Sequence, residues 1–145
     1  MNSVVHRALE DLLDREIDVA RNLQATLESE RAALTGDSPD AVVKLAAEKI
    51  ALLAAIEQLE EERRSLWNGP ADIGSGFAAL VAERWGALMK VMAGCRIANE
   101  INGHIIHVRQ HQIRQLIDIV RGGPAITYDP QGKTFAKALR ALARA

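Results

Sequence analysis

The fold is decided by residues 39–67, PDAVVKLAAEKIALLAAIEQLEEERRSLW, in which the residues that set the pattern return at alternating intervals of three and four. This heptad spacing aligns one side of an α-helix for packing against other helices. Ala46, Ile50 and Leu53 widen the apolar stripe beyond a two-stranded seam, which predicts more than one neighbouring helix. The positions that keep the heptad spacing are Val42, Leu45, Lys49, Leu52, Ile56, Leu59, Arg63 and Leu66.

Two cations, Lys49 and Arg63, interrupt this seam. We expect their aliphatic stems to cover its margin while the charged groups reach water. The alternative is a specific buried ion pair.

A first helix is predicted over residues 4–34, because Leu9, Leu13, Ile17, Ala20, Leu23, Leu27 and Leu34 recur at helical spacing. The turn TGDSP ends it. In that turn Gly36 suits a helix C-terminus, Ser38 suits the cap of the next helix and Pro39 its first position.

The third periodic segment covers about residues 76–121, after the loop at 68–76. Its apolar face stays in phase throughout, which predicts one long helix. A break at Asn102–Gly103, giving two helices that fold back on each other, is the alternative. Residues 122–145 begin with GGPAITYDPQG, which has no period, and end with a short amphipathic helix predicted over about 134–144. We therefore expect a helical domain at 1–121 and a flexible tail at 122–145.

Composition agrees with an all-α protein of one domain. The chain has 145 residues, of which 48% are hydrophobic but only 3% aromatic, and a sheet protein would use more aromatic side chains. The predicted fold is an antiparallel three-helix bundle or coiled coil with a long third helix.

Charge and patterning exclude several other classes. A formal charge of −1 lacks the basic footprint of a nucleic-acid-binding protein. No apolar run approaches the roughly 20 residues of a membrane span, and the acidic, amphipathic start is unlike a signal peptide. The single cysteine, Cys95, fits a reducing compartment, so a cytoplasmic protein is expected.

The end of the third helix is predicted to be a binding surface for another protein. At about 1.5 Å per residue, the first two helices are each roughly 45 Å long and the third is closer to 70 Å. Its last part would extend beyond its neighbours with an uncovered apolar stripe, which typically marks a partner site. The stripe consists of Ile106, Ile113, Leu116, Ile117 and Val120.

Polar residues of the third helix allow two interpretations each. Asn99 and Asn102 lie on its apolar side, either as buried amides that fix register or as hydrogen-bonding partners of a docked helix. The face formed by Glu100, His104, His107 and His111 has spacing that could bind zinc, but it points away from the apolar side. We expect a solvated face there, with no metal and no cofactor.

Catalysis has little support in the sequence. Cys95 lies on the apolar face, where a thiol behaves as an inert small hydrophobe. No phosphate-binding loop, serine elbow or pair of buried carboxylates is recognisable, so no enzyme is predicted. Tyr128, the only tyrosine, stands in the aperiodic stretch and is a candidate interface anchor.

The chain resembles the flagellar export chaperones of the FlgN family over nearly its full length. The resemblance rests on EKIALLAAIEQLEEERR (48–64), AERWGAL (82–88), INGHIIHVRQHQIRQLIDIV (101–120) and ITYDPQGKT (126–134), in that order. The Asn-Gly within the third helix, followed by the Tyr-x-x-x-Gly turn, is the more specific part.

The resemblance implies a cytoplasmic chaperone without ATPase activity. Such a protein receives the C-terminal amphipathic helices of the two hook–filament junction proteins, prevents their premature assembly and keeps them competent for export. Tyr128 corresponds to the family's tyrosine that docks on the cytosolic domain of the export-gate membrane protein, although Asp129 replaces the glycine that usually follows it. The positions implied for client binding are the stripe residues Ile106, Ile113, Leu116, Ile117 and Val120, together with the tail. We also expect Asn102, on the apolar side of the third helix, and Phe135, Leu139 and Leu142 of the tail to belong to the client site.

Two other classes stay open at this point. A generic helical adaptor or coiled-coil subunit would self-associate through the heptads of residues 39–67. A metal-responsive protein would use the histidine face, and zinc would then raise its melting temperature.

Overall fold

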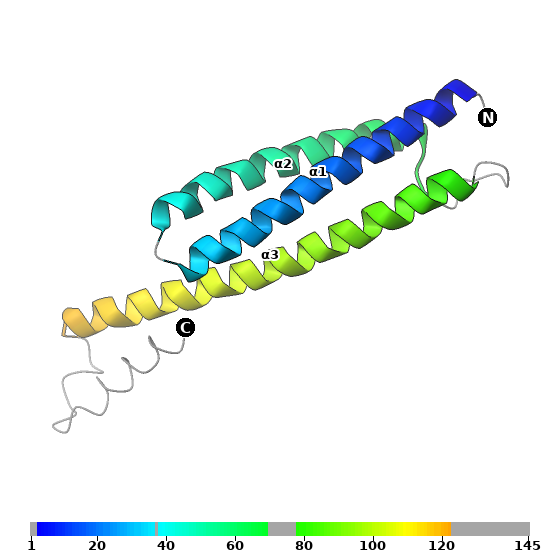
Figure 1. Ribbon diagram of the computed structural model, residues 1–145. Coiled ribbons are helices and arrows are strands. Elements are labelled where there is room, and N and C mark those ends of the chain that lie inside the picture. Colours follow the sequence, from blue (N-terminus) through cyan, green and yellow to red (C-terminus); the bar gives the residue numbers. More distant parts are fainter. Residues whose placement is uncertain (1–2, 37, 70–77, 123–145) are drawn as a thin grey trace. The chain divides into compact units, whose positions relative to one another are not determined.

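The computed structural model describes residues 3–36, 38–69 and 78–122. These contain three helices, α1 (Ser3–Thr35), α2 (Pro39–Leu66) and α3 (Ala78–Val120), and no strand (Figure 1). The all-α prediction is confirmed. Within this described part, no helix carries an apolar stretch of the length needed to cross a lipid bilayer.

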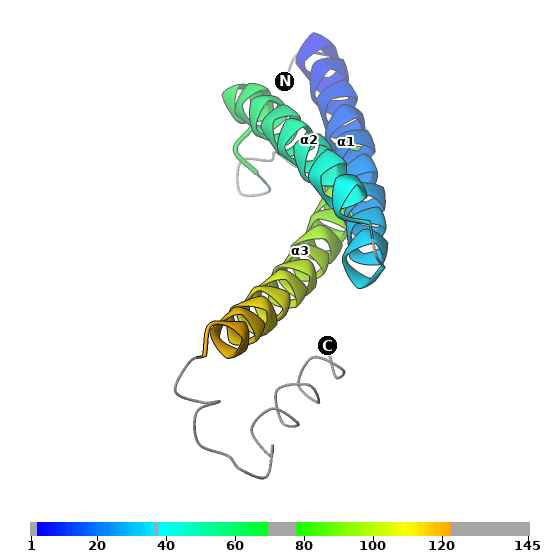
Figure 2. The same cartoon turned by 90° about the vertical axis from the view of Figure 1, so that its left-hand side faces the viewer.

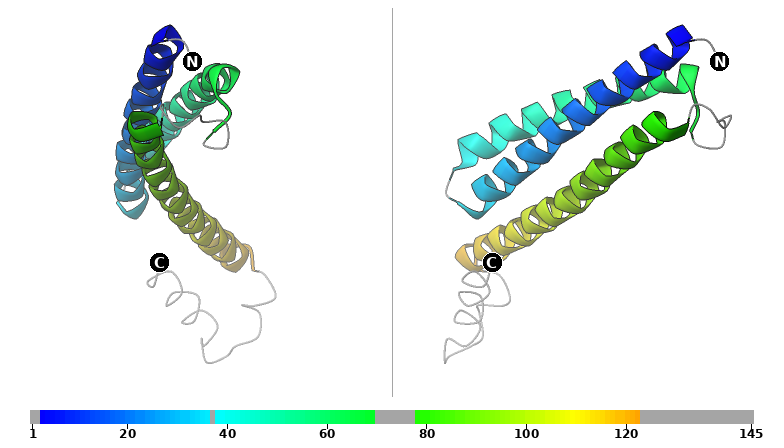
Figure 3. Two further views of the ribbon diagram at one scale, coloured as in Figure 1. Left: turned by 90° about the vertical axis from the view of Figure 1, so that its right-hand side faces the viewer. Right: turned by 45° about the vertical axis from the view of Figure 1, so that its right-hand side comes forward.

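A connection of three residues, 36–38, joins α1 to α2, and the two helices lie side by side in opposite directions (Figures 1 and 3). Pro39 occupies the start of α2, where its missing N–H costs no helical hydrogen bond. The expected side-chain cap from Ser38 is absent. Instead the carbonyl oxygen of Ser38 accepts a hydrogen bond from the N–H of Val42 at 3.2 Å.

The chain divides into two compact units, Met1–Glu100 and Ile101–Ala145. In the first unit, α1, α2 and the part of α3 that ends at Glu100 form a three-helix bundle. The core cluster nearer the start of α1 joins Leu9 and Leu13 to Val81 and Leu88, and a second cluster joins Leu23 and Leu27 to Cys95. Residue numbers rise together in both clusters, so this part of α3 runs parallel to α1 and antiparallel to α2.

The helix α1 is the central element of the bundle, with α2 beside it in the views of Figures 1 and 2. Ten of its 33 residues are buried, whereas α2 buries only Leu59 and Arg63 among its 28. Most of the interior is therefore supplied by α1.

The second unit is described for residues 101–122. The helix α3 is continuous through Asn102–Gly103, so the alternative of two helices that fold back is wrong. It ends where Gly122 adopts a positive φ of 73° and donates its N–H to the carbonyl oxygen of Ile119 at 3.1 Å. The domain boundary expected at 121/122 stays a prediction.

Candidate functional site

The predicted apolar stripe of α3 is exposed over its last two turns. Counting about 100° per residue, its members lie on one side of the helix, within an arc of roughly 100°. Ile106 is half-buried, and the remaining members expose large fractions of their surface: Ile113 56%, Leu116 40%, Ile117 41% and Val120 80%. Four large apolar side chains open to solvent on one face can bind the apolar face of another helix.

The two asparagines of the predicted buried face differ. Asn102 is fully buried, but Asn99 is exposed. Its side-chain oxygen accepts a hydrogen bond from Nζ of Lys49 at 3.3 Å, so it connects α3 to α2 at the surface. The expectation of two buried amides therefore holds for Asn102 alone.

The polar face of α3 lies open to water. Glu100, His104, His107 and His111 are all exposed. Among residues 3–36, 38–69 and 78–122, no three histidine, cysteine or acidic side chains come together in a way that would hold a metal ion.

Four predicted site residues lie outside the described residues. These are Tyr128 and the apolar positions of the predicted tail helix, Phe135, Leu139 and Leu142.

The seam cation Arg63 is buried, so the expectation that it reaches water is wrong. Its Nε donates to both carboxylate oxygens of Glu16, at 2.9 and 3.2 Å, and both residues are at most 4% exposed. The guanidinium also stacks on the ring of Trp85, 4.7 Å from its centroid, and Trp67 meets the same ring edge-on at 5.1 Å. Burial raises the pKa of Glu16, and the charge and hydrogen bond of Arg63 oppose that rise.

Lys49 occupies an intermediate position at the other interruption of the seam. Its Nζ lies 3.0 Å from a carboxylate oxygen of Glu30, whose side chain is 2% exposed, while Lys49 itself keeps 20% of its side chain in water. Lys49 therefore combines both alternatives, because its side chain stays in partial contact with water and its charged group forms an ion pair. The heptad register placed each cation correctly, but its partner lies on α1 and was not predicted.

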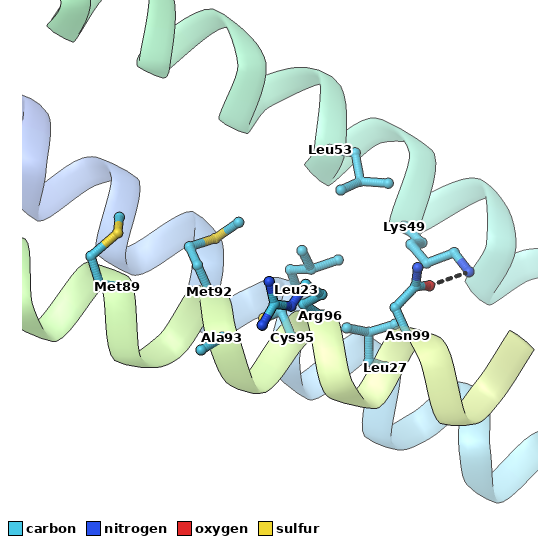
Figure 4. Close-up of a pocket in the computed structure, with 10 residues that line it drawn as sticks. All are labelled: Leu23, Leu27, Lys49, Leu53, Met89, Met92, Ala93, Cys95, Arg96 and Asn99. Atoms are coloured by element: carbon cyan, nitrogen blue, oxygen red, sulfur yellow. Dashed lines mark hydrogen bonds between the residues drawn. The ribbon is translucent and has the colours of Figure 1, made fainter. Parts of the chain in front are cut away.

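Between these two interruptions, α2 and α3 border a groove that the sequence did not predict. Its volume is about 510 Å³. Leu53 points from α2 toward α3, and Met89 and Met92 point from α3 toward α2 (Figure 4). The remaining lining residues are Leu23, Leu27, Lys49, Ala93, Cys95, Arg96 and Asn99. The two methionines, one turn apart, were the available signal, because methionine is common on surfaces that accept varied apolar partners.

At the base of this groove, Cys95 is buried and its Sγ donates to the carbonyl oxygen of Ala20 at 3.4 Å. Burial raises the pKa of the Cys95 thiol. A thiol in this state is a poor nucleophile, which agrees with its prediction as a packing residue.

Two apolar surfaces on the described helices point to protein binding. No curated protein and no solved structure matches the chain. A family model described as FlgN protein matches residues 1–135. The chain therefore belongs to the FlgN family of flagellar export chaperones.

Proposed function

We propose that this chaperone binds the C-terminal amphipathic helices of the two hook–filament junction proteins in the bacterial cytoplasm. Binding covers the surfaces through which those proteins would assemble prematurely. The chaperone then delivers them to the cytosolic domain of the export-gate membrane protein. This function is supported by membership of the FlgN family together with the exposed stripe of α3.

The exposure of Ile113, Leu116, Ile117 and Val120 is the observation that carries the proposal. A client helix that lays its apolar face on this stripe removes both surfaces from water, at about 25 cal/mol for each Å² of apolar area. Phe135, Leu139 and Leu142 of the tail are proposed to complete the client site, and ordering them on binding would lower the affinity.

Delivery is proposed to use a different residue, Tyr128. A docking residue outside the client stripe allows a loaded chaperone to reach the gate. Tyr128→Ala is therefore expected to weaken binding to the gate domain while client binding persists. Loss of both activities together would contradict separate sites.

The client stripe is tested by titrating the C-terminal fragment of each junction protein into the full chain by calorimetry. The variant Ile113→Asp with Leu116→Asp places two charges on the stripe. We expect its dissociation constant to rise by at least about 30-fold, since hot-spot residues contribute about 2 kcal/mol or more.

A matched variant on the opposite face of the same helix, His111→Asp with Gln115→Asp, controls for added charge. Both of its positions are exposed, so it should bind like the wild type. Unchanged binding by the stripe variant would reject the stripe as the client site. A wild-type chain that binds neither fragment would reject the proposed function.

A further inference from the structure

The groove between α2 and α3 is bounded at one end by a polar contact. Lys49 of α2 hydrogen-bonds Asn99 of α3 there, and both residues line the groove. Along α3 the lining residues extend from Met89 to Asn99, ten positions apart, which corresponds to about 15 Å. The groove therefore has the length of about three helical turns.

The walls of the groove are apolar and partly open. Leu53 of α2 and Met89 of α3 are each 40% exposed, and the buried Leu23 and Leu27 of α1 lie behind them. The partly buried Leu52 and Ile56 of α2 pack against the core cluster of Leu23, Leu27 and Cys95. A further amphipathic helix lying over the groove would cover these exposed apolar side chains and would be the fourth helix at this site.

The charges around the groove select the occupant. Lys49 is already paired with Glu30, but Arg96 is exposed on the rim and has no carboxylate within 4 Å among the described residues. No acidic side chain lines this groove. Residues 133–145 of this chain carry four cations and no acidic group, so their charge does not complement Arg96.

We infer that this groove is a second client-binding surface, which takes an acidic amphipathic helix of about three turns. The apolar side of that helix contacts Leu53, Met89 and Met92, and a carboxylate next to its apolar side pairs with Arg96. Flexible methionine side chains allow the same walls to fit helices of different sequence, as two clients require. The inference rests on the proposed function and adds a second contact to it.

The test measures binding of the same two C-terminal client fragments to the full chain. Leu53→Glu with Met89→Glu places acidic groups in the groove, and we expect affinity to fall at least 10-fold. The matched control is Val43→Glu with Leu80→Glu, two exposed apolar residues that do not line the groove, and it should stay within twofold of the wild type.

A charge reversal tests the acidic character of the client helix. Arg96→Glu is expected to weaken binding about fivefold in 50 mM salt and less in 500 mM salt, because exposed charges are screened. The control Lys90→Glu changes an exposed cation of α3 that does not line the groove, and it should have a smaller effect. Equal effects of the two reversals would contradict an ion pair with Arg96.

The outcomes separate this inference from the proposed function. No binding by the wild type overturns both. If the stripe variant loses client binding while the groove variant keeps wild-type affinity, the groove is not a client-binding surface and the proposed function still holds. If sedimentation shows that the groove variant loses a dimer while client affinity is unchanged, the occupant is a second copy and the inference is wrong.

A photo-cross-linker keeps the test decisive if the groove variant fails to fold. Benzoylphenylalanine at position 53 should capture the bound fragment, and the same group at position 43 should not. Absence of a product at position 53, with client binding intact, would overturn the inference.

Discussion

The buried pair of Glu16 and Arg63 yields the sharpest prediction about stability. Replacing Arg63 by Met keeps an unbranched apolar stem but removes the charge. The variant loses both hydrogen bonds to Glu16 and the stacking on Trp85. It also leaves a carboxylate with almost no solvent contact and no cation beside it.

Removing one partner of a buried ion pair costs about 3–5 kcal/mol. The loss of a desolvated cation–π contact, about 2 kcal/mol, is part of this figure. For a chain of this length, the melting temperature should fall by about 10–15 °C at pH 7.

The cost should depend on pH. Burial already holds the pKa of Glu16 above 4.5, and Arg63→Met removes the two effects that oppose the rise. A carboxyl group with a raised pKa in the folded state contributes its full stability below about pH 4.5 and loses it as pH rises through the folded pKa. The free energy of unfolding that Arg63→Met loses relative to the wild type should therefore be largest at pH 7 and should decrease toward pH 4.5.

Urea unfolding followed by circular dichroism at several pH values measures this deficit. The double variant Glu16→Leu with Arg63→Met removes both charges and should recover most of the lost stability, with no pH-dependent deficit from this site. A cost below about 1 kcal/mol for Arg63→Met at pH 7, or a double variant as unstable as the sum of the single ones, would refute the reasoning.

Three further predictions concern single positions. Gly86→Ala should raise the melting temperature by about 2–4 °C in a thermal scan, because nothing lies within 4 Å of the added Cβ and alanine favours a helix; a decrease would show an unseen clash. Cys95 should react with a thiol reagent at least about 100-fold more slowly in the native protein than in urea, since burial raises the pKa of its thiol; equal rates would contradict its burial. Arg84→Ala breaks a 2.8 Å ion pair with the exposed Asp14 and should lower the melting temperature by less than about 3 °C; a larger fall would mean that this surface pair has a structural role.

The three helices could be predicted because apolar spacing along one chain segment determines which side of a helix is buried. The angular count also grouped Ile113, Leu116, Ile117 and Val120 on one face, where the structure exposes all four. Burial at a single position is harder to predict. Asn99 and Asn102 lie about 60° apart around α3, yet one is exposed and the other buried.

Pairings between helices could not be predicted from periodicity. Glu16 and Arg63 are 47 positions apart, and their contact depends on the register between α1 and α2. The groove at Leu53 and Met89 depends on the same register, because it follows from how α2 and α3 are placed on α1. The heptad pattern predicted the positions of Lys49 and Arg63, but not the carboxylates that pair with them.

The sparse burial of α2 has a consequence for the order in which the bundle comes apart. Detaching α2 uncovers the side of α1 that packs against it and separates Arg63 from Glu16, but it leaves the contacts between α1 and α3 in place. Local opening of α2 should therefore require less free energy than opening of α1, which buries ten residues. The backbone amides of α2 should exchange with deuterium first, while α1 and residues 78–100 of α3 remain joined through their leucines.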